Sequence, residues 1–162
     1  VLQGRVVYLA ANGFLYCRLP SGRVISYAMP RLVRQIQRPA KRAWVDAAGT
    51  HHPAQEATYK YAVEFDATNS YTKRWEAHTL YGGLQFNNVV QGLARDKLVA
   101  SMFRLEAAGY PLVLTVHDEN VSEVPAGFGS WQEYRDIMAL ADDWCPDMPT
   151  AVGAWSDHRY VK

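Results

Sequence analysis

Cysteine is scarce in this sequence, and long apolar runs are absent. Only Cys17 and Cys145 occur among the 162 residues, so neither a disulfide framework nor a paired-cysteine metal site is expected. Two reduced thiols are typical of a cytosolic protein, and we expect a cytoplasmic location. No run of about eighteen apolar residues is present, so no membrane-spanning helix and no membrane partner are predicted.

Several motifs that carry chemistry are also missing. The chain has no Gly-rich phosphate loop of the P-loop kind and no Ser-His-Asp order that supports nucleophilic catalysis. His51, His52, His78 and His158 are scattered, without the spacing of a metal site. Hydrophobic residues nevertheless make up 49% of the chain, which is enough to bury the core of a single domain over residues 1–162.

Acidic residues are absent from the first 45 positions. That segment contains eight Lys or Arg residues and no Asp or Glu, a charge of +8, whereas the rest of the chain carries −7. We interpret residues 1–45 as a basic β-hairpin segment. Such asymmetry indicates an anionic partner, and phosphate backbones fit because Lys and Arg release condensed counterions on binding them. A solvated basic face that binds nothing is the alternative.

Strand signals dominate the first 65 residues. Residues 4–9, 14–19 and 23–27 are rich in β-branched and aromatic side chains, and Pro20-Ser21-Gly22 predicts a hairpin turn between the last two. Residues 28–56 contain three prolines and mixed charge, which predicts irregular surface chain. Residues 59–65 alternate and predict one more strand.

Helical spacing appears in the second half of the chain. Apolar residues recur at a helical period from about 84 to 108, and Gly109 followed by Pro111 predicts the stop. Residues 112–116 form an apolar run typical of a buried strand, and 120–124 predict the return strand. Ser130 and Glu133 form a capping box that opens a helix through about Ala141. Residues 150–155 and 159–161 predict short strands.

These elements predict an α+β fold: an antiparallel sheet of hairpins, one long helix and a shorter C-terminal helix. The strands precede, interrupt and follow the helices without βαβ regularity, which argues against a doubly wound sheet.

One cluster of polar residues interrupts the predicted second hairpin. His117, Asp118 and Glu119 follow an apolar strand directly. Unpaired carboxylates are costly to bury, so this cluster faces solvent or meets cations, and Mg²⁺ is a natural partner for oxygen ligands. An ordinary hydrophilic hairpin turn is the alternative, because short motifs match often by chance.

The wider context resembles the end of the palm in family A DNA polymerases. There, a helix with an Asn, Gln-Gly and Ala pattern precedes a β-hairpin whose turn reads Val-His-Asp-Glu, the third polymerase motif. The matching segments are 87–96 (NNVVQGLARD), 104–109 (RLEAAG) and 114–125 (LTVHDENVSEVP). The chain resembles the phage and prophage branch of this family at three more segments, 15–23 (LYCRLPSGR), 81–83 (YGG) and 159–162 (RYVK).

This resemblance implies roles for individual residues. Asp118 matches the metal-binding Asp of the third motif. Glu119 matches a supporting acidic residue, and His117 matches a residue that lies near the primer terminus. Asn87 and Gln91 match helix positions along the bound duplex, one turn apart. The implied cofactor is Mg²⁺, in the complete enzyme, and the implied partners are primer-template DNA, a deoxynucleotide and the remaining polymerase segment.

The chain also departs from the family pattern. A first metal-binding Asp and a nucleotide-binding helix are required upstream. Asp66 ends an apolar strand, and Lys73 precedes Tyr81-Gly82, but Asn69 and Ala77 occupy the positions where the family has an Arg and an aromatic ring. We therefore interpret Asp66 as a surface residue and Lys73 as solvated or DNA-facing. Since the chain also begins with Val1 rather than Met, we expect a processed or excised piece.

Three hypotheses follow from the sequence. The chain is the C-terminal palm portion of a template-directed DNA polymerase, with nucleotidyl transfer by two metals. Alternatively, it is a catalytically inactive palm-derived module that binds DNA or protein, or an interaction protein aimed at a host target. The polymerase hypothesis predicts that residues 87–95 pack beside the 112–124 hairpin. Whether the chain acts as an enzyme by itself is left open.

Overall fold

The computed structural model describes residues 5–160, and these form an α+β fold with antiparallel sheets and two helices. The fold class predicted from the sequence is therefore confirmed. The chain divides into two compact units, one with residues 18–25 and 87–160 and the other with 8–17 and 26–86. The single domain expected over 1–162 stays a prediction. Within residues 5–160, neither helix has the length and apolar character needed to cross a bilayer.

A five-stranded sheet occupies residues 7–80, with strand order β1-β2-β3-β6-β7. Its strands are β1 Val7–Ala11, β2 Phe14–Arg18, β3 Val24–Arg38, β6 Thr58–Thr68 and β7 Trp75–Leu80. The strands predicted at 14–19, 23–27 and 59–65 are confirmed. The strand predicted at 4–9 is displaced toward Ala11, and its first residue lies outside the described residues. The sequence pattern missed β7, which pairs antiparallel with β6.

The prediction of irregular chain over 28–56 is wrong for much of that segment. β3 continues to Arg38, and two short strands follow, β4 Trp44–Val45 and β5 His51–His52. Pro30 is tolerated inside β3 because it lies at an irregularity, where the register with β6 shifts between Ala28 and Arg31 and Met29 has φ 49°. The ladder with β6, a segment remote in sequence, supplies the hydrogen bonds that make 31–38 a strand.

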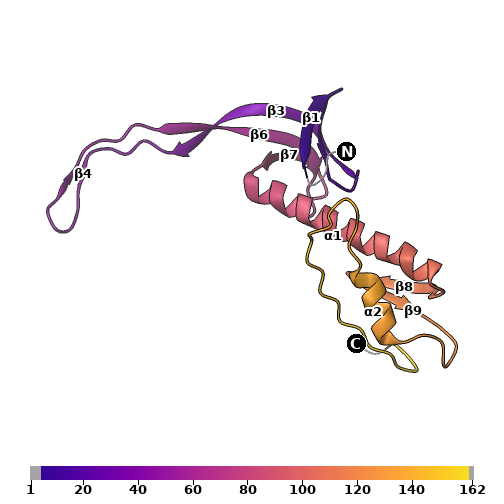
Figure 1. Cartoon of the computed structure of the whole chain (residues 1–162). Helices are drawn as coiled ribbons and strands as arrows, with labels where there is room; N and C mark the ends of the chain where they lie inside the picture. Colours follow the sequence, from indigo (N-terminus) through magenta and orange to yellow (C-terminus); the bar gives the residue numbers. More distant parts are fainter. Residues whose placement is uncertain (1–4, 161–162) are drawn as a thin grey trace. The chain divides into compact units, whose positions relative to one another are not determined.

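We call residues 31–61 the arm. Within their unit, β3 and β6 run on together past the other strands and end at the β4–β5 hairpin (Figure 1). The ladder continues from Arg38↔Thr58 through an isolated bridge between Lys41 and Gln55 to the pair Trp44↔His52. Paired residues thus recur along the arm as far as the hairpin, while residues 39–40, 42–43, 53–54 and 56–57 belong to no strand.

The long helix α1, Gly82–Ala107, confirms the helix predicted over 84–108. It ends at Gly109, whose φ of 87° is the left-handed conformation that glycine adopts without a Cβ penalty. The Tyr110 amide donates to the Leu105 carbonyl at 2.9 Å and the Gly109 amide to the Glu106 carbonyl at 3.1 Å, the pattern of a Schellman cap. The cap turns the chain back toward the strand that follows.

The segment 18–25 packs on α1 at a glycine. A Cβ at Gly92 would lie 2.6 Å from Leu19 Cδ1, closer than side chains approach one another, so only glycine fits at this point of the helix. One turn further on, Asp96 accepts hydrogen bonds from Ser21 and from Arg23 Nε, the latter at 2.6 Å. The predicted Pro20-Ser21-Gly22 turn is therefore held against the helix by packing and by charge.

A buried ion cluster holds the later part of the chain to α1. Asp142, 7% exposed, lies 2.9 Å from Lys97 Nζ and 2.6 Å from Arg104 Nη1. Burial raises the pKa of the Asp142 carboxyl, but hydrogen bonds and charge from Lys97 and Arg104 outweigh it and hold that pKa below its ordinary value. Lys97 and Arg104 also donate to the Leu140 carbonyl. They thereby satisfy the backbone carbonyl of the residue that caps the second helix at its C-terminus.

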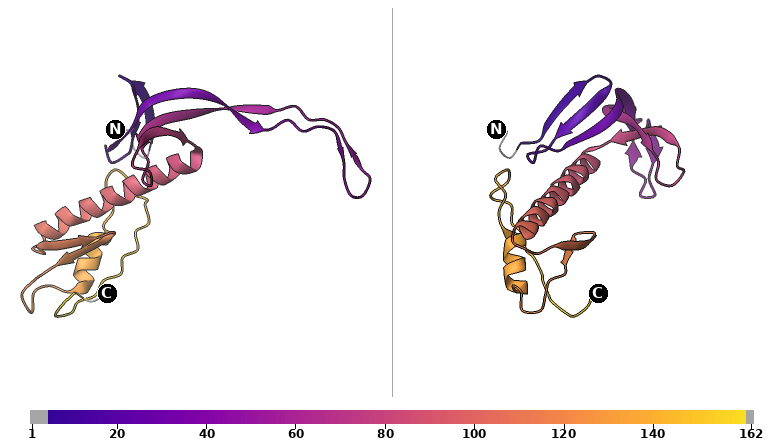
Figure 2. Two further views of the ribbon diagram at one scale, coloured as in Figure 1. Left: turned by 180° about the vertical axis from the view of Figure 1, so that it is seen from behind. Right: turned by 90° about the vertical axis from the view of Figure 1, so that its right-hand side faces the viewer.

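The second hairpin and second helix complete this unit. β8 is Leu112–Val116, β9 is Glu119–Ser122 and α2 is Trp131–Ala139. Figure 2 shows both strands and α2 beside the C-terminal half of α1. The capping box is confirmed in part, since Ser130 Oγ accepts from the Glu133 amide at 3.1 Å.

Two predictions for this part of the chain are wrong. β8 is not buried, because Val113 is 58% exposed and the two-stranded ribbon leaves one face uncovered among the described residues. Residues 150–160 contain no strand, since they find no ladder partner within the described chain, and Val161 lies outside it.

Candidate functional site

The β8–β9 hairpin places the His117-Asp118-Glu119 cluster at one turn. Val116 pairs with Glu119, so His117 and Asp118 are the two central residues of the turn and Glu119 is the first residue of β9. His117 has φ 53°. Two-residue hairpin turns need a positive φ at their first central position, a conformation that histidine adopts more readily than most residues. The predicted turn is thus present, with only two of the three polar residues in it.

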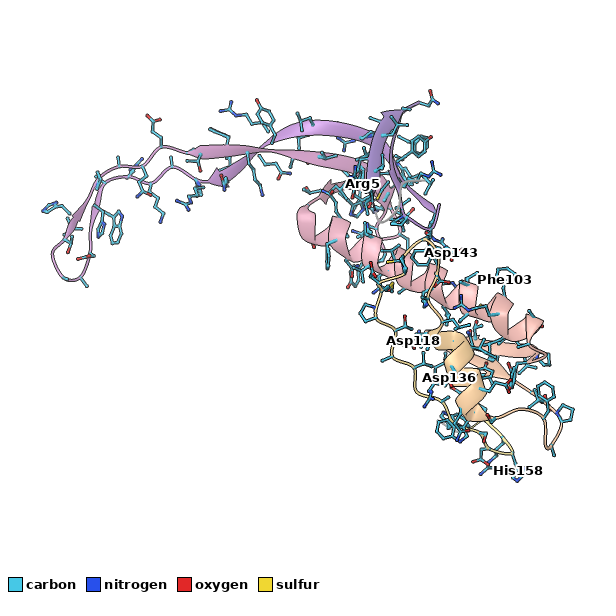
Figure 3. The ribbon with its side chains drawn as sticks, in the orientation of Figure 1. Arg5, Phe103, Asp118, Asp136, Asp143 and His158 are labelled. Atoms are coloured by element: carbon cyan, nitrogen blue, oxygen red, sulfur yellow. The ribbon has the colours of Figure 1, made fainter. Side chains whose placement is uncertain are left out.

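The three side chains have different surroundings. His117 and Asp118 are exposed, and within residues 5–160 the Asp118 carboxylate has no ion pair. Glu119 is half-buried and accepts a hydrogen bond from the Tyr160 hydroxyl at 2.8 Å. This bond raises the pKa of the Tyr160 phenol, because the neutral hydroxyl donates to a carboxylate. Figure 3 labels Asp118, which belongs to the same unit as α2. Asp118 is therefore free to meet an external cation, whereas Glu119 is engaged.

A hydrogen-bond network fixes the hairpin against both helices. Asn120 Nδ2 donates to Ser101 Oγ on α1 at 3.0 Å, and the Tyr134 hydroxyl of α2 donates to the Asn120 carbonyl at 3.1 Å. Tyr134 also lies 3.1 Å from Ser122 Oγ, and burial raises the pKa of its phenol. These positioning residues were not predicted from the sequence, because their partners are 12 to 19 positions away.

Tyr110 ties the hairpin to the start of α2. Its hydroxyl accepts from the Ser130 amide at 3.1 Å and donates to Glu133 Oε2 at 2.5 Å. The hydroxyl therefore bridges the two ends of the capping box, where the Glu side chain would otherwise reach the Ser amide directly. Burial, followed by the bond to Glu133, raises the pKa of the Tyr110 phenol. The Tyr110 ring packs edge-on against Tyr134 at 5.2 Å between centroids.

The predicted helix residues Asn87 and Gln91 lie one turn apart on an exposed face of α1. Val90, Ala94 and Arg95 are exposed on the same face, at the spacing of a single helical stripe. Within the described chain, Arg95 forms no ion pair. Arg95 lies in a segment that resembles the polymerase family, but the sequence analysis gave it no role. Its spacing of four residues from Gln91 places both residues on one helix face, and this spacing could have indicated a shared role.

The hairpin runs back along α1 toward this stripe. The Leu112 amide donates to Glu106 Oε1 at 2.7 Å, and Asn120, opposite Thr115, reaches Ser101. Two further strand residues, about 7 Å of strand, lead from Thr115 to the turn. The hydrogen bonds from α1 to the hairpin thus come from Ser101 and Glu106, and packing of 87–95 beside the hairpin stays a prediction.

Metal ligands are incomplete in the part of the chain that the structure describes. No group of three or more His, Cys, Asp or Glu side chains there lies close enough to hold a metal ion. Asp118 and Glu119 supply oxygen donors of the kind that Mg²⁺ prefers, but Mg²⁺ needs six ligands, several of them from water, phosphate or other carboxylates. The turn therefore fits a role as one contributor to a metal site and not as a complete one.

The two residues weighed as upstream counterparts lie in the other unit. Asp66 forms an ion pair with Arg31 at 2.8 Å. Lys73 lies in the turn between β6 and β7, with φ 57°, and residues 75–80 form a strand instead of a helix. The chain between Lys73 and Tyr81 therefore lacks the helical geometry of a nucleotide-binding segment.

Comparison with known proteins gives one relationship for nearly the whole chain. The sequence is 34% identical over 143 residues to a DNA polymerase of Bacillus phage SP02, in an alignment that covers 88% of this chain and 19% of that polymerase. The chain thus spans about a fifth of the length of the relative it matches. No protein-family model and no solved structure matches the chain. The chain is therefore similar to one segment of a phage DNA polymerase.

Proposed function

We propose that the chain is the C-terminal palm portion of a template-directed family A DNA polymerase, contributing one metal-binding Asp and contacts to duplex DNA. The observation that carries this proposal is the exposed, unpaired Asp118 at a hairpin turn fixed to α1, in a chain similar to a phage DNA polymerase.

The proposal assigns a distinct task to each side chain. Asp118 would offer its carboxylate to Mg²⁺, and further ligands would come from a second Asp outside the described residues and from nucleotide phosphates. When bound, the metals stabilise charge on the attacking and leaving oxygens of an in-line displacement. Glu119, oriented by Tyr160, would support the site without leaving its hydrogen bond. His117, exposed beside Asp118, would face the primer terminus.

The exposed stripe of α1 would position the duplex. Asn87 and Gln91 present amide groups that both donate and accept hydrogen bonds, and Arg95 adds a positive charge that phosphate attracts. All three lie in the same unit as Asp118. A primer-template bound along the stripe would thereby approach the hairpin turn.

Primer extension with Mg²⁺ tests the polymerase proposal, with the chain alone and then mixed with a separately expressed N-terminal polymerase segment from the same source. We expect extension in the mixture, reduced by about a thousandfold or more in Asp118→Asn, since a lost metal ligand removes several kcal/mol of transition-state stabilisation. Glu123→Gln is the matched control, because Glu123 is an exposed carboxylate just beyond β9. Equal loss in both variants, or none in Asp118→Asn, contradicts the proposed role.

The alternative is a catalytically inactive palm-derived module that binds DNA or protein. It is favoured by the incomplete ligand set of the described residues. Primer extension by the mixture separates the two, once binding of primer-template DNA to the intact chain has been measured by fluorescence anisotropy. The alternative predicts binding that weakens with Gln91→Ala and not with Gln132→Ala, an exposed amide on α2, while no mixture extends the primer.

A further inference from the structure

The arm carries an excess of positive charge that its own residues do not neutralise. Residues 31–61 contain six Lys or Arg and two acidic residues, a net charge of +4, and none of these 31 residues is buried. Arg31 forms ion pairs with Glu64 and Asp66, at the base of the arm. The other five cations form no ion pair with any described residue: Arg34, Arg38, Lys41, Arg42 and Lys60.

The register of β3 and β6 sorts the side chains of the arm onto two faces. Leu32 pairs with Val63, Arg34 with Tyr61 and Ile36 with Tyr59, and residues that pair directly share a face. This aromatic face is exposed, with Tyr61 72% accessible. The opposite face holds Val33, Gln35 and Lys60, and Gln35 on that face is half-buried.

Aromatic rings and cations are interleaved on the aromatic face and at the tip. The Arg34 guanidinium carbon lies over the Tyr59 ring, 3.8 Å from its centroid, a cation–π contact on the aromatic face. At the tip, Trp44 is stacked on His52 at 4.0 Å between centroids and is itself exposed. His52 lies 3.0 Å from Asp46, which lowers the pKa of that carboxyl and holds the imidazole in place. Figure 3 shows side chains projecting along both edges of this ribbon.

This combination of features matches single-stranded nucleic acid better than the alternatives. Proteins that bind single strands combine cations that follow the phosphate backbone with aromatic rings on which bases stack. A protein partner for the aromatic face would have to bring acidic groups to neutralise the five unpaired cations. A duplex would satisfy the cations, but its stacked bases are closed to Tyr59 and Tyr61.

We propose that the arm is a binding site for single-stranded nucleic acid, in which bases stack on Tyr59 and Tyr61 and phosphates meet Arg34, Lys41 and Arg42. The site is distinct from the Asp118 turn and belongs to the other unit. It does not depend on polymerase activity, so a chain that fails in primer extension can still bind through the arm.

Fluorescence anisotropy of the intact chain with a labelled oligothymidine tests the stacking part. Tyr61→Ala is expected to weaken binding by about 5- to 150-fold, the cost of one lost base stack. Tyr71→Ala is the matched control, because Tyr71 is 93% exposed in the turn between β6 and β7, outside the arm. Unchanged affinity in Tyr61→Ala, or equal losses in both variants, overturns the proposal.

A second pair of variants separates face-specific binding from general attraction. Arg34→Gln and Lys60→Gln each remove one positive charge from opposite faces of the same ladder. We expect Arg34→Gln to lose more affinity and to lower the slope of log affinity against log salt by about 0.7, the value for one phosphate contact on a single strand. Equal effects of the two variants would indicate nonspecific attraction and contradict the proposal.

Competition identifies the kind of partner. Unlabelled oligothymidine should displace the probe at least tenfold more effectively than a blunt duplex of equal length, while Gln132→Ala, at an exposed amide on α2, leaves this binding unchanged. Equal displacement by the duplex overturns the stacking geometry. Absence of any oligothymidine binding by the folded chain, as judged by circular dichroism, also overturns the proposal and leaves the aromatic face to a protein partner.

Discussion

The arm and the C-terminal half of α1 obtain their order in opposite ways. The arm is held by a backbone ladder, and none of its side chains is buried. The C-terminal half of α1 buries Leu98, Ser101 and Leu105 and engages Lys97 and Arg104 in the ion cluster around Asp142. Where the backbone supplies the order, side chains stay available for a partner. Where side chains supply the order, they already contact other side chains of the same unit and are not available to a partner.

Breaking the ion cluster should produce the largest effect. Asp142→Asn keeps the shape of the side chain but leaves Lys97 and Arg104 without their carboxylate. Removing one partner of a buried pair costs about 3–5 kcal/mol of unfolding free energy. Urea unfolding at pH 7, followed by circular dichroism, measures the loss. Asp143→Asn, at an exposed position next in sequence, should stay within about 0.5 kcal/mol of the parent chain.

Truncating one apolar side chain in each region sharpens the comparison further. Leu105→Ala should cost about 2–5 kcal/mol, because Leu105 is 0% exposed and the cavity cannot fill. Ile36→Ala on the arm should cost no more than about 0.5 kcal/mol, because Ile36 is already largely exposed. Hydrogen exchange of peptides from α1 and from the arm locates each loss. Comparable losses in the two variants would mean that the arm is covered in solution.

The pH dependence of stability should give the smallest of the three effects. The folded-state pKa of Asp142 lies below its unfolded value of about 3.9, so its contribution is present above that pH and is lost as pH falls through the folded pKa. The difference in unfolding free energy between the parent chain and Asp142→Asn should therefore shrink between about pH 5 and pH 3. A difference that stays constant over this range would show that Asp142 does not titrate with unfolding.

The sequence predicted those parts of the fold whose signals are local. The period of α1, the stop at Gly109 and the cap at Ser130 each involve residues within a few positions of one another. The turn at His117 and Asp118 was predicted for the same reason, since two central residues and their flanking strands specify a hairpin. The roles assigned to Asp118, Glu119, His117, Asn87 and Gln91 remain predictions that the experiments above address.

The features that the sequence missed depend on contacts between distant segments. The prolines of 28–56 predicted irregular chain, yet the ladder with β6 makes 31–38 a strand. The apolar run of β8 predicted burial, but only the arrangement of neighbouring elements decides whether a strand is covered. The role of Tyr110 was missed for the same reason, because its hydroxyl bonds to residues of the capping box that are 20 or more positions away.

The sequence by itself determined the two helices, the turns at 20–22 and 117–118 and the charge of the first 45 residues, because propensity, periodicity and capping act over a few neighbours. Only the tertiary structure decided which cations are neutralised and which stay free. Lys97 and Arg104 form ion pairs with Asp142, about 40 positions away, whereas five of the six cations of the arm form no ion pair with a carboxylate of the described residues. The sequence determines how many charges the chain carries. Whether a charge is neutralised depends on its distance from an opposite charge, and only the folded structure fixes that distance.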